Sequence, residues 1–96
     1  MPDWHVYLIR AGDGALYAGV TTDVARRFSE HRENGPKCAR YLRGKAPLHL
    51  VFHKKIGSRS LALKAEWRLK RLPKSGKEKI VRSNPSRRKL IAQLEM

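Results

Sequence analysis

The 96-residue sequence predicts an α+β fold, in which helices pack on a three-stranded antiparallel sheet in the order ββαβα, followed by C-terminal helices. Near the N-terminus, two short segments rich in aromatic and β-branched residues flank a glycine-rich turn, a pattern typical of a hairpin. Beyond residue 58, apolar residues recur at helical spacing. We therefore expect a single domain over residues 1–96, with its core at about 4–72 and basic helices at about 74–94.

The predicted hairpin joins residues 4–10 to residues 16–20, and its loop decides which side chains share a face of the sheet. A two-residue turn would pair Tyr17 with Arg10 and place Tyr7 and Tyr17 on opposite faces. A three-residue loop, Gly12-Asp13-Gly14, would pair Tyr17 with Ile9 and bring both phenols onto one face. Two glycines in the connection favour the longer loop.

The first helix is predicted to begin after Thr22 or Asp23, either of which is a good N-cap, and to run to about Glu33. Asn34-Gly35-Pro36 ends it, because glycine suits a left-handed cap and proline cannot continue a helix. Residues 37–46 are basic and are expected to form a helical turn within an irregular loop.

The third strand is predicted at residues 48–52, with an extension to Ile56. Ser58 or Ser60 then caps a second long helix that runs to about Leu72, where Pro73 stops it. Two shorter helices are expected at 74–82 and 85–94.

The charge of the chain indicates a polyanionic partner. Lys and Arg number 22 against eight acids, which gives +14 and a pI near 10.8. Residues 1–50 carry eight bases and five acids, and residues 51–96 carry fourteen and three. A disordered basic tail is the alternative for the C-terminal part. Helical spacing of five apolar residues argues against that alternative: Ile80, Val81, Leu90, Ile91 and Leu94.

Composition also indicates where in the cell the protein is located. No stretch reaches the 18 apolar residues that span a bilayer, and the N-terminus lacks the pattern of a signal peptide. Cys38 is the only cysteine, so neither an internal disulfide nor a cysteine zinc site is expected. We expect a cytoplasmic protein that binds nucleic acid rather than a membrane.

Glu66 stands out in the second helix because it is a carboxylate among bases. On a helical wheel it lies about 40° beyond Ala62, at the edge of the stripe that should face the core. The predicted stripe comprises Leu61, Ala62, Ala65, Leu69 and Leu72. An acid beside a core is costly unless it is paired or binds a metal. An ordinary ion pair to Lys70, four residues on, is the simpler interpretation.

Arg27 and His31 stand out in the first helix. They are four residues apart and lie along the face that Val24 and Phe28 mark as buried, where the helix should meet the sheet. An ordinary core or surface histidine is the alternative for His31. Arg26 points outward and is typical either of a phosphate contact or of a solvated surface.

These residues together resemble the GIY-YIG nuclease family, and most closely its small stand-alone bacterial branch of the YhbQ type. The resemblance covers residues 4 to about 70 and rests on His5-Val6-Tyr7, Tyr17-Ala18-Gly19, Thr21, Arg27, His31 and Glu66. His5 and Ala18 depart from the family's triplets, at positions that carry no catalytic group. Some members carry an Asn near the end of the domain, for which only Asn84 is a candidate here.

The resemblance implies a catalytic set of Tyr7, Tyr17, Arg27, His31 and Glu66. Glu66 would hold one divalent ion, Mg²⁺ or Mn²⁺. Arg27 would clamp the charge that develops on the phosphate. Either tyrosine would deprotonate the attacking water, with His31 relaying the proton. A phenol has an ordinary pKa of about 10, which the metal, Arg27 and nearby lysines are expected to lower.

The implied activity is that of a metal-dependent endonuclease that hydrolyses phosphodiester bonds in DNA, either structure-specific or directed to single strands or damage. The alternative is a DNA- or RNA-binding protein that keeps the fold without turnover. A protein partner that supplies specificity also fits, because the chain has no appended domain. The predicted nucleic-acid contacts are Arg26, Lys37, Arg40, Arg43, Lys45 and Lys70.

Overall fold

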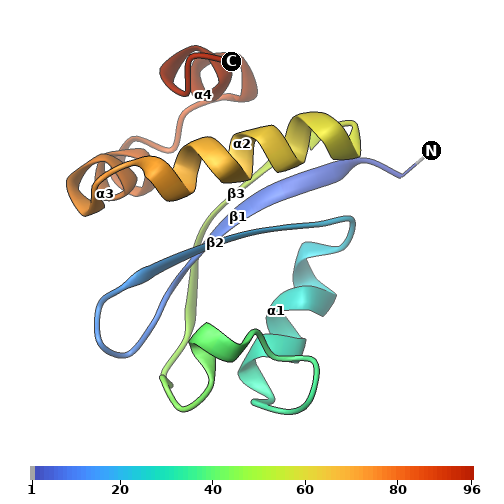
Figure 1. The fold of residues 1–96 in the computed structure, drawn as a ribbon, viewed down its shortest axis with the longest axis vertical. Helices are drawn as coiled ribbons and strands as arrows, with labels where there is room; N and C mark the ends of the chain where they lie inside the picture. Colours follow the sequence, from blue (N-terminus) through green and yellow to red (C-terminus); the bar gives the residue numbers. More distant parts are fainter. Residues whose placement is uncertain (1) are drawn as a thin grey trace.

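A computed structural model describes residues 2–96 and has the predicted α+β architecture (Figure 1). Each predicted helix and strand is present, with boundaries within about two residues of those expected from the sequence. The elements are β1 (Trp4–Arg10), β2 (Leu16–Thr21), α1 (Val24–Arg32), a 3-10 turn (Arg40–Leu42), β3 (His49–Gly57), α2 (Arg59–Arg71), α3 (Lys74–Ser83) and α4 (Arg87–Gln93).

The three strands are antiparallel in the order β2-β1-β3, so β2 and β3 are both edge strands. Ile9 lies opposite Tyr17 and Tyr7 lies opposite Gly19. The N–H of Ala11 donates to the carbonyl of Ala15 at 2.9 Å, which closes the longer of the two loops considered above. Tyr7 and Tyr17 therefore lie on the same face of the sheet.

Helices α2, α3 and α4 lie on one side of the strands and α1 lies on the other (Figure 1). The side of α2, α3 and α4 holds a hydrocarbon core that is aliphatic apart from Phe52, formed by Val6, Leu8, Ala18, Phe52, Ile56, Ala62, Ala65, Leu69, Ile80, Leu90 and Leu94. The side of α1 holds a second cluster, formed by Tyr7, Ile9, Ala11, Cys38 and Leu42 with Tyr17, Phe28, Leu48 and Leu50 packed against it.

Local hydrogen bonds explain where the helices begin and end. The Asp23 carboxylate accepts from the N–H of Arg26 at 3.1 Å, and the Ser58 hydroxyl accepts from the N–H of Leu61 at 3.2 Å. After α1, the left-handed residue is Asn34 (φ 55°) rather than the predicted Gly35. The Asn34 side chain accepts from the N–H of Gly44 at 3.1 Å, which ties the end of the helix to the following loop.

Two expectations about packing have clear outcomes. Leu61 was predicted to face the core, yet it is 40% exposed, because the face of α2 that contacts the sheet is a narrow one of Ala62, Ala65 and Leu69. The basic C-terminal segment is helical and packed rather than a disordered tail, with Ile80, Leu90 and Leu94 buried. Between residues 2 and 96, none of the helices combines the length and apolar character needed to cross a bilayer.

Candidate active site

Three rings lie together on the α1 side of the sheet, two from the hairpin and one from α1. The ring centroids of Tyr7 and Tyr17 are 6.5 Å apart, and His31 lies 6.0 Å from Tyr7 and 5.7 Å from Tyr17. The Tyr7 hydroxyl is 2.9 Å from Nε2 of His31. Tyr7 and His31 are buried, whereas Tyr17 is only partly covered, so the cluster opens to solvent beside Tyr17.

The other nitrogen of His31 determines which way its hydrogen bond to Tyr7 runs. The backbone N–H of Ala39 donates to Nδ1 at 3.2 Å, so Nδ1 is an acceptor and carries no proton. Burial, with a smaller contribution from the charge of Arg27, lowers the pKa of His31 from 6.5 to about 4. The ring is therefore neutral with its proton on Nε2, and His31 donates to the Tyr7 oxygen.

This arrangement differs from the proton relay expected for His31. A relay would need a free nitrogen lone pair facing Tyr7, and the only acceptor nitrogen of His31 is already bonded to Ala39. The hydroxyl hydrogen of Tyr7 consequently points away from His31.

The tyrosines also differ from expectation in the direction of their pKa. Burial raises the pKa of Tyr7 from 10.0 to about 12, the neighbouring Tyr17 adds to the rise, and Arg27 opposes it. Burial likewise raises the pKa of Tyr17, again opposed by Arg27. In this cluster, desolvation outweighs the nearby positive charge, which is the reverse of the lowering expected from the sequence.

Arg27 is held in place by two partners. Its guanidinium lies 3.1 Å from the Glu30 carboxylate and donates to the backbone carbonyl of Lys37 at 2.6 Å. A planar guanidinium anchored in this way keeps a fixed orientation beside the Tyr7 ring.

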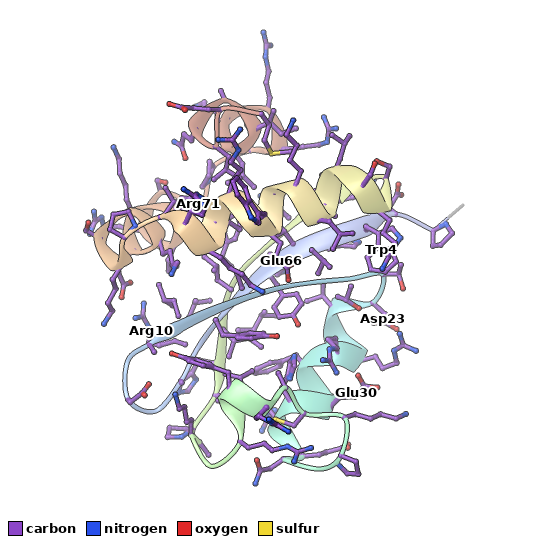
Figure 2. The ribbon with its side chains drawn as sticks, in the orientation of Figure 1. Trp4, Arg10, Asp23, Glu30, Glu66 and Arg71 are labelled. Carbon is purple, nitrogen blue, oxygen red and sulfur yellow. The ribbon has the colours of Figure 1, made fainter. Side chains whose placement is uncertain are left out.

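Glu66 reaches this cluster from the opposite side of the sheet. It projects from α2, which packs over β1 and β2, and Figure 2 shows it on the side of the helix that faces the strands. Its carboxylate is 19% exposed and lies 3.5 Å from Nζ of Lys70. That nitrogen is 5.9 Å from the Tyr17 ring, so both side chains extend to the edge formed by β2. The ion pair considered from the sequence is therefore present.

Glu66 is the candidate for holding a metal ion. Within the described range, residues 2–96, no group of three or more His, Cys, Asp and Glu side chains is arranged to hold a metal. A site at Glu66 would thus rely on one carboxylate, which suits Mg²⁺ because that ion keeps several of its waters. The Glu66 side chain is partly exposed, and Nζ of Lys70 lies 3.5 Å from its carboxylate, too far for a short ion pair. Both features are compatible with such a site.

The predicted phosphate contacts lie on α1, on the loop between α1 and β3, and on α2. Arg26 and Lys37 line a hollow of about 510 Å³ beside α1. Arg43 donates to the carbonyl of Pro36 at 3.2 Å, and Arg40 is exposed in the 3-10 turn. Lys45 lies 3.7 Å from the Tyr41 ring.

Tyr41 lies against the cluster although the sequence did not indicate it, and Gly19, known from the sequence only as part of the second triplet, contacts Tyr7 directly. Tyr41 stacks on Tyr17 at 5.9 Å with an interplanar angle of 21°, although its segment was interpreted only as basic. Gly19 lies under the Tyr7 phenol, where a Cβ would overlap the Tyr7 ring and hydroxyl. The glycine of the second triplet therefore has a packing role that its spacing alone did not reveal.

Thr21 and Asn84, the other two polar residues considered for the family pattern, have structural roles in the fold. The Thr21 hydroxyl accepts from the N–H of Asp23 at 3.1 Å and so links β2 to α1. Asn84 takes the left-handed conformation that ends α3 (φ 44°) and borders β3 rather than the tyrosines.

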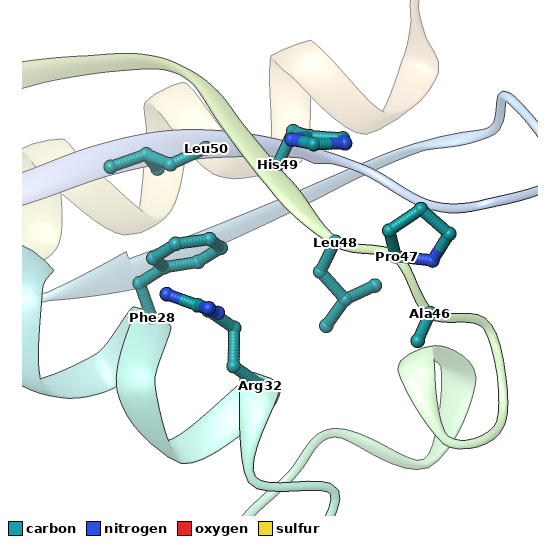
Figure 3. A pocket seen from close by; sticks show the side chains of 7 residues that line it. All are labelled: Phe28, Arg32, Ala46, Pro47, Leu48, His49 and Leu50. Atoms are coloured by element: carbon teal, nitrogen blue, oxygen red, sulfur yellow. The ribbon is translucent and has the colours of Figure 1, made fainter.

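A separate hollow of about 530 Å³ lies between α1 and the start of β3 (Figure 3). The Arg32 guanidinium lies 5.6 Å from the centroid of the Phe28 ring, and Leu48 and Leu50 also line the hollow. The lining includes none of the residues of the predicted catalytic set, so we do not assign the chemistry to this hollow.

Comparison with known proteins supports the fold and the family that the spacing of the motif residues indicates. Residues 3–79 match the family described as the GIY-YIG catalytic domain. A UPF0213 protein of Citrobacter koseri is 48% identical over 95 residues, covering 99% of this chain and 93% of that protein. A UPF0213 protein of Yersinia enterocolitica is 54% identical over 83 residues, covering 86% and 84%.

A solved structure is also similar. The solution NMR structure of a UPF0213 protein from Bacillus halodurans has a TM-score of 0.53 and 37% identity, and the match covers 82% of each chain. The chain therefore belongs to the GIY-YIG family of nuclease catalytic domains.

Proposed function

We propose that this protein is a metal-dependent endonuclease that hydrolyses phosphodiester bonds in DNA. The observation that carries the proposal is the meeting of Tyr7, Tyr17, Arg27 and His31 with Glu66 at the edge of β2. A protein that only binds nucleic acid needs bases on its surface. It does not need a buried, hydrogen-bonded tyrosine–histidine pair beside a lone carboxylate.

Tyr7 is the tyrosine to which we assign the general base. It receives the hydrogen bond of His31, and Arg27 lies close enough to favour its ionised form. As a phenolate, Tyr7 would accept the proton of the attacking water, and His31 would stabilise the phenolate by donating from Nε2. Tyr17, more exposed and stacked on Tyr41, would position the water and the substrate.

Arg27 would bind the phosphate that is being cut. Its contacts with Glu30 and Lys37 fix the guanidinium before the substrate arrives, so little ordering is required during the reaction. Glu66 would hold the divalent ion, which supplies polarisation of the phosphate and stabilisation of the leaving oxygen. Lys70 would then be released from Glu66 to contact a neighbouring phosphate.

The test is nicking of supercoiled plasmid and cleavage of single-stranded, branched and damaged DNA in Mg²⁺ or Mn²⁺. Wild-type protein should cut at least one of these, and Glu66→Gln should not. Glu33→Gln is the matched control, because Glu33 is exposed at the end of α1. Equal products from wild type and Glu66→Gln, or binding without any cutting, would rule out the nuclease and leave a nucleic-acid-binding protein.

A further inference from the structure

Trp67 is the most exposed of the large hydrophobic side chains in the described part of the chain, with 54% of its surface open. Tryptophan is usually well covered, because burying its large ring contributes strongly to stability. Trp67 lies on the outer surface of α2, opposite the narrow face that packs on the sheet, and so contributes little to the core. The fold does not explain why this position carries a tryptophan.

The ring is flanked by positive charge. The Arg71 guanidinium lies 4.6 Å from the Trp67 ring centroid and the Arg68 guanidinium lies 5.6 Å from it. Neither arginine takes part in any ion pair found among residues 2–96. Arg71 is exposed and keeps its charge available to an anion, whereas Arg68 is half-buried, with its Nε covered and without a hydrogen-bond partner in the described part of the chain.

This surface lies on the helix that carries Glu66. Trp67 follows Glu66 directly in α2, and successive helical residues differ by about 100° around the axis. Figure 2 shows Glu66 and Arg71 on the same helix, with Glu66 turned towards the strands. A strand whose phosphate lies at Glu66 and that continues around α2 would therefore reach the Trp67 ring.

We propose that Trp67, Arg68 and Arg71 form a stacking subsite for one unpaired base of the nucleic-acid strand beside the cut, with the arginines binding the flanking phosphates. This inference rests on the proposed nuclease function. An aromatic ring between cations matches a nucleotide, which combines a flat base with a negative phosphate. A paired base would not serve, because its faces are already covered in the duplex.

Binding measurements test the subsite without cutting. In a Glu66→Gln background, Trp67→Ala should weaken binding to a fluorescently labelled oligothymidylate roughly 5- to 150-fold. Trp67→Tyr should recover most of the affinity, because a phenol ring also stacks. Leu63→Ala is the matched control, since Leu63 is 37% exposed one turn earlier in the same helix, and it should change affinity less than about twofold. Alanine favours helix, so neither substitution should disturb α2.

Fluorescence distinguishes stacking from charge attraction. Trp4 is the only other tryptophan, so Trp4→Phe leaves Trp67 as the sole reporter. Oligothymidylate should quench its emission, and a chain of the same length built from abasic nucleotides should bind without quenching. Equal quenching by both would overturn the proposal, as would equal affinities of Trp67→Ala and Leu63→Ala.

The two proposals can fail separately. If the wild-type protein cuts nothing and Trp67→Ala still weakens binding, the stacking subsite stands and the nuclease does not. If the protein cuts and Trp67→Ala binds as Leu63→Ala does, the nuclease stands and the stacking subsite is wrong.

Discussion

On the side of the sheet covered by α2, α3 and α4 the buried side chains are hydrocarbon, aliphatic apart from Phe52, whereas on the side covered by α1 they include hydrogen-bonded aromatic rings. Leu8 and Tyr7 are consecutive in β1 and point to opposite sides. Leu8 needs no partner other than close packing. Tyr7 needs His31 to satisfy its hydroxyl, and His31 in turn needs the N–H of Ala39.

If the proposed function is correct, stability depends mainly on one side of the sheet and the chemistry takes place on the other. The aliphatic side supplies non-directional burial, which tolerates changes of shape better than changes of volume. The aromatic side holds polar groups whose burial is costly unless every hydrogen bond is made. The proposed reaction uses the second side, and the Glu66 side chain extends towards it from α2, on the first side, past the edge formed by β2.

The largest expected contrast comes from the two neighbours in β1. Tyr7→Phe should lower the cleavage rate by about 10²- to 10⁴-fold, the usual contribution of a general base, and cost about 1–3 kcal/mol of stability, because it leaves the buried Nε2–H of His31 unpaired. Leu8→Ala should instead cost about 2–5 kcal/mol by leaving a cavity, with cleavage by the folded fraction unchanged. Urea unfolding and single-turnover cleavage measure both quantities. Similar rate losses in the two variants would contradict the separation of the faces.

The pH dependence of cleavage tests the raised pKa of Tyr7. Because that pKa is about 12, the phenolate is a minor form at neutral pH, and its fraction grows about tenfold per pH unit. Between pH 7 and 9 the rate should therefore rise about 100-fold if proton transfer to Tyr7 limits it. A rate that levels off near pH 7 would assign the base to another group.

Gly19→Ala tests how closely the second triplet supports Tyr7. The added Cβ would overlap the Tyr7 ring and hydroxyl, so the ring must move and the cleavage rate should fall about 10- to 100-fold. Gly35→Ala is the matched control, because nothing lies within 4 Å of its Cβ position and its φ is not positive. Gly35→Ala should cut like the wild type. A fully active Gly19→Ala would mean that the position of Tyr7 is not critical.

The smallest expected effect concerns stability in mild acid. The pKa of His31 is about 4 in the folded protein and about 6.5 when unfolded, so the unfolded state takes up a proton first as the pH falls. Stability should drop by about 2–3 kcal/mol between pH 7 and 4.5, and the loss should stop growing below pH 4. His31→Gln should flatten this dependence, and the same change at the exposed His53 should not. Urea midpoints across this range provide the measurement.

The secondary structure was predictable because its signals are local. Asp23 and Ser58 cap the helices they precede, and Pro73 separates α2 from α3, as the sequence indicated. The register of the hairpin could be predicted from the length of its loop. A loop with an odd number of residues places Tyr7 and Tyr17 on the same face of the sheet. These features depend on a few neighbouring residues.

The remaining features depend on contacts between distant segments. No pattern indicates that the N–H of Ala39 would reach His31 and decide its tautomer. The raised pKa of Tyr7 depends on how deeply the fold buries it. The prediction that Leu61 faces the core was wrong, because a helical wheel gives the direction of a side chain but not how far the sheet extends beneath it. Tyr41 lies in a loop whose path only the tertiary structure determines.

The most direct test of the central claim compares single-turnover cleavage by Tyr7→Phe, Glu66→Gln and the double variant on one labelled DNA strand. If the two residues act on the same reaction at the edge of β2, the double variant should lose no more activity than the worse single variant, because groups that act as a unit are not additive. Losses that multiply would indicate independent roles. Cleavage retained in the double variant would show that this cluster is not where the DNA is cut.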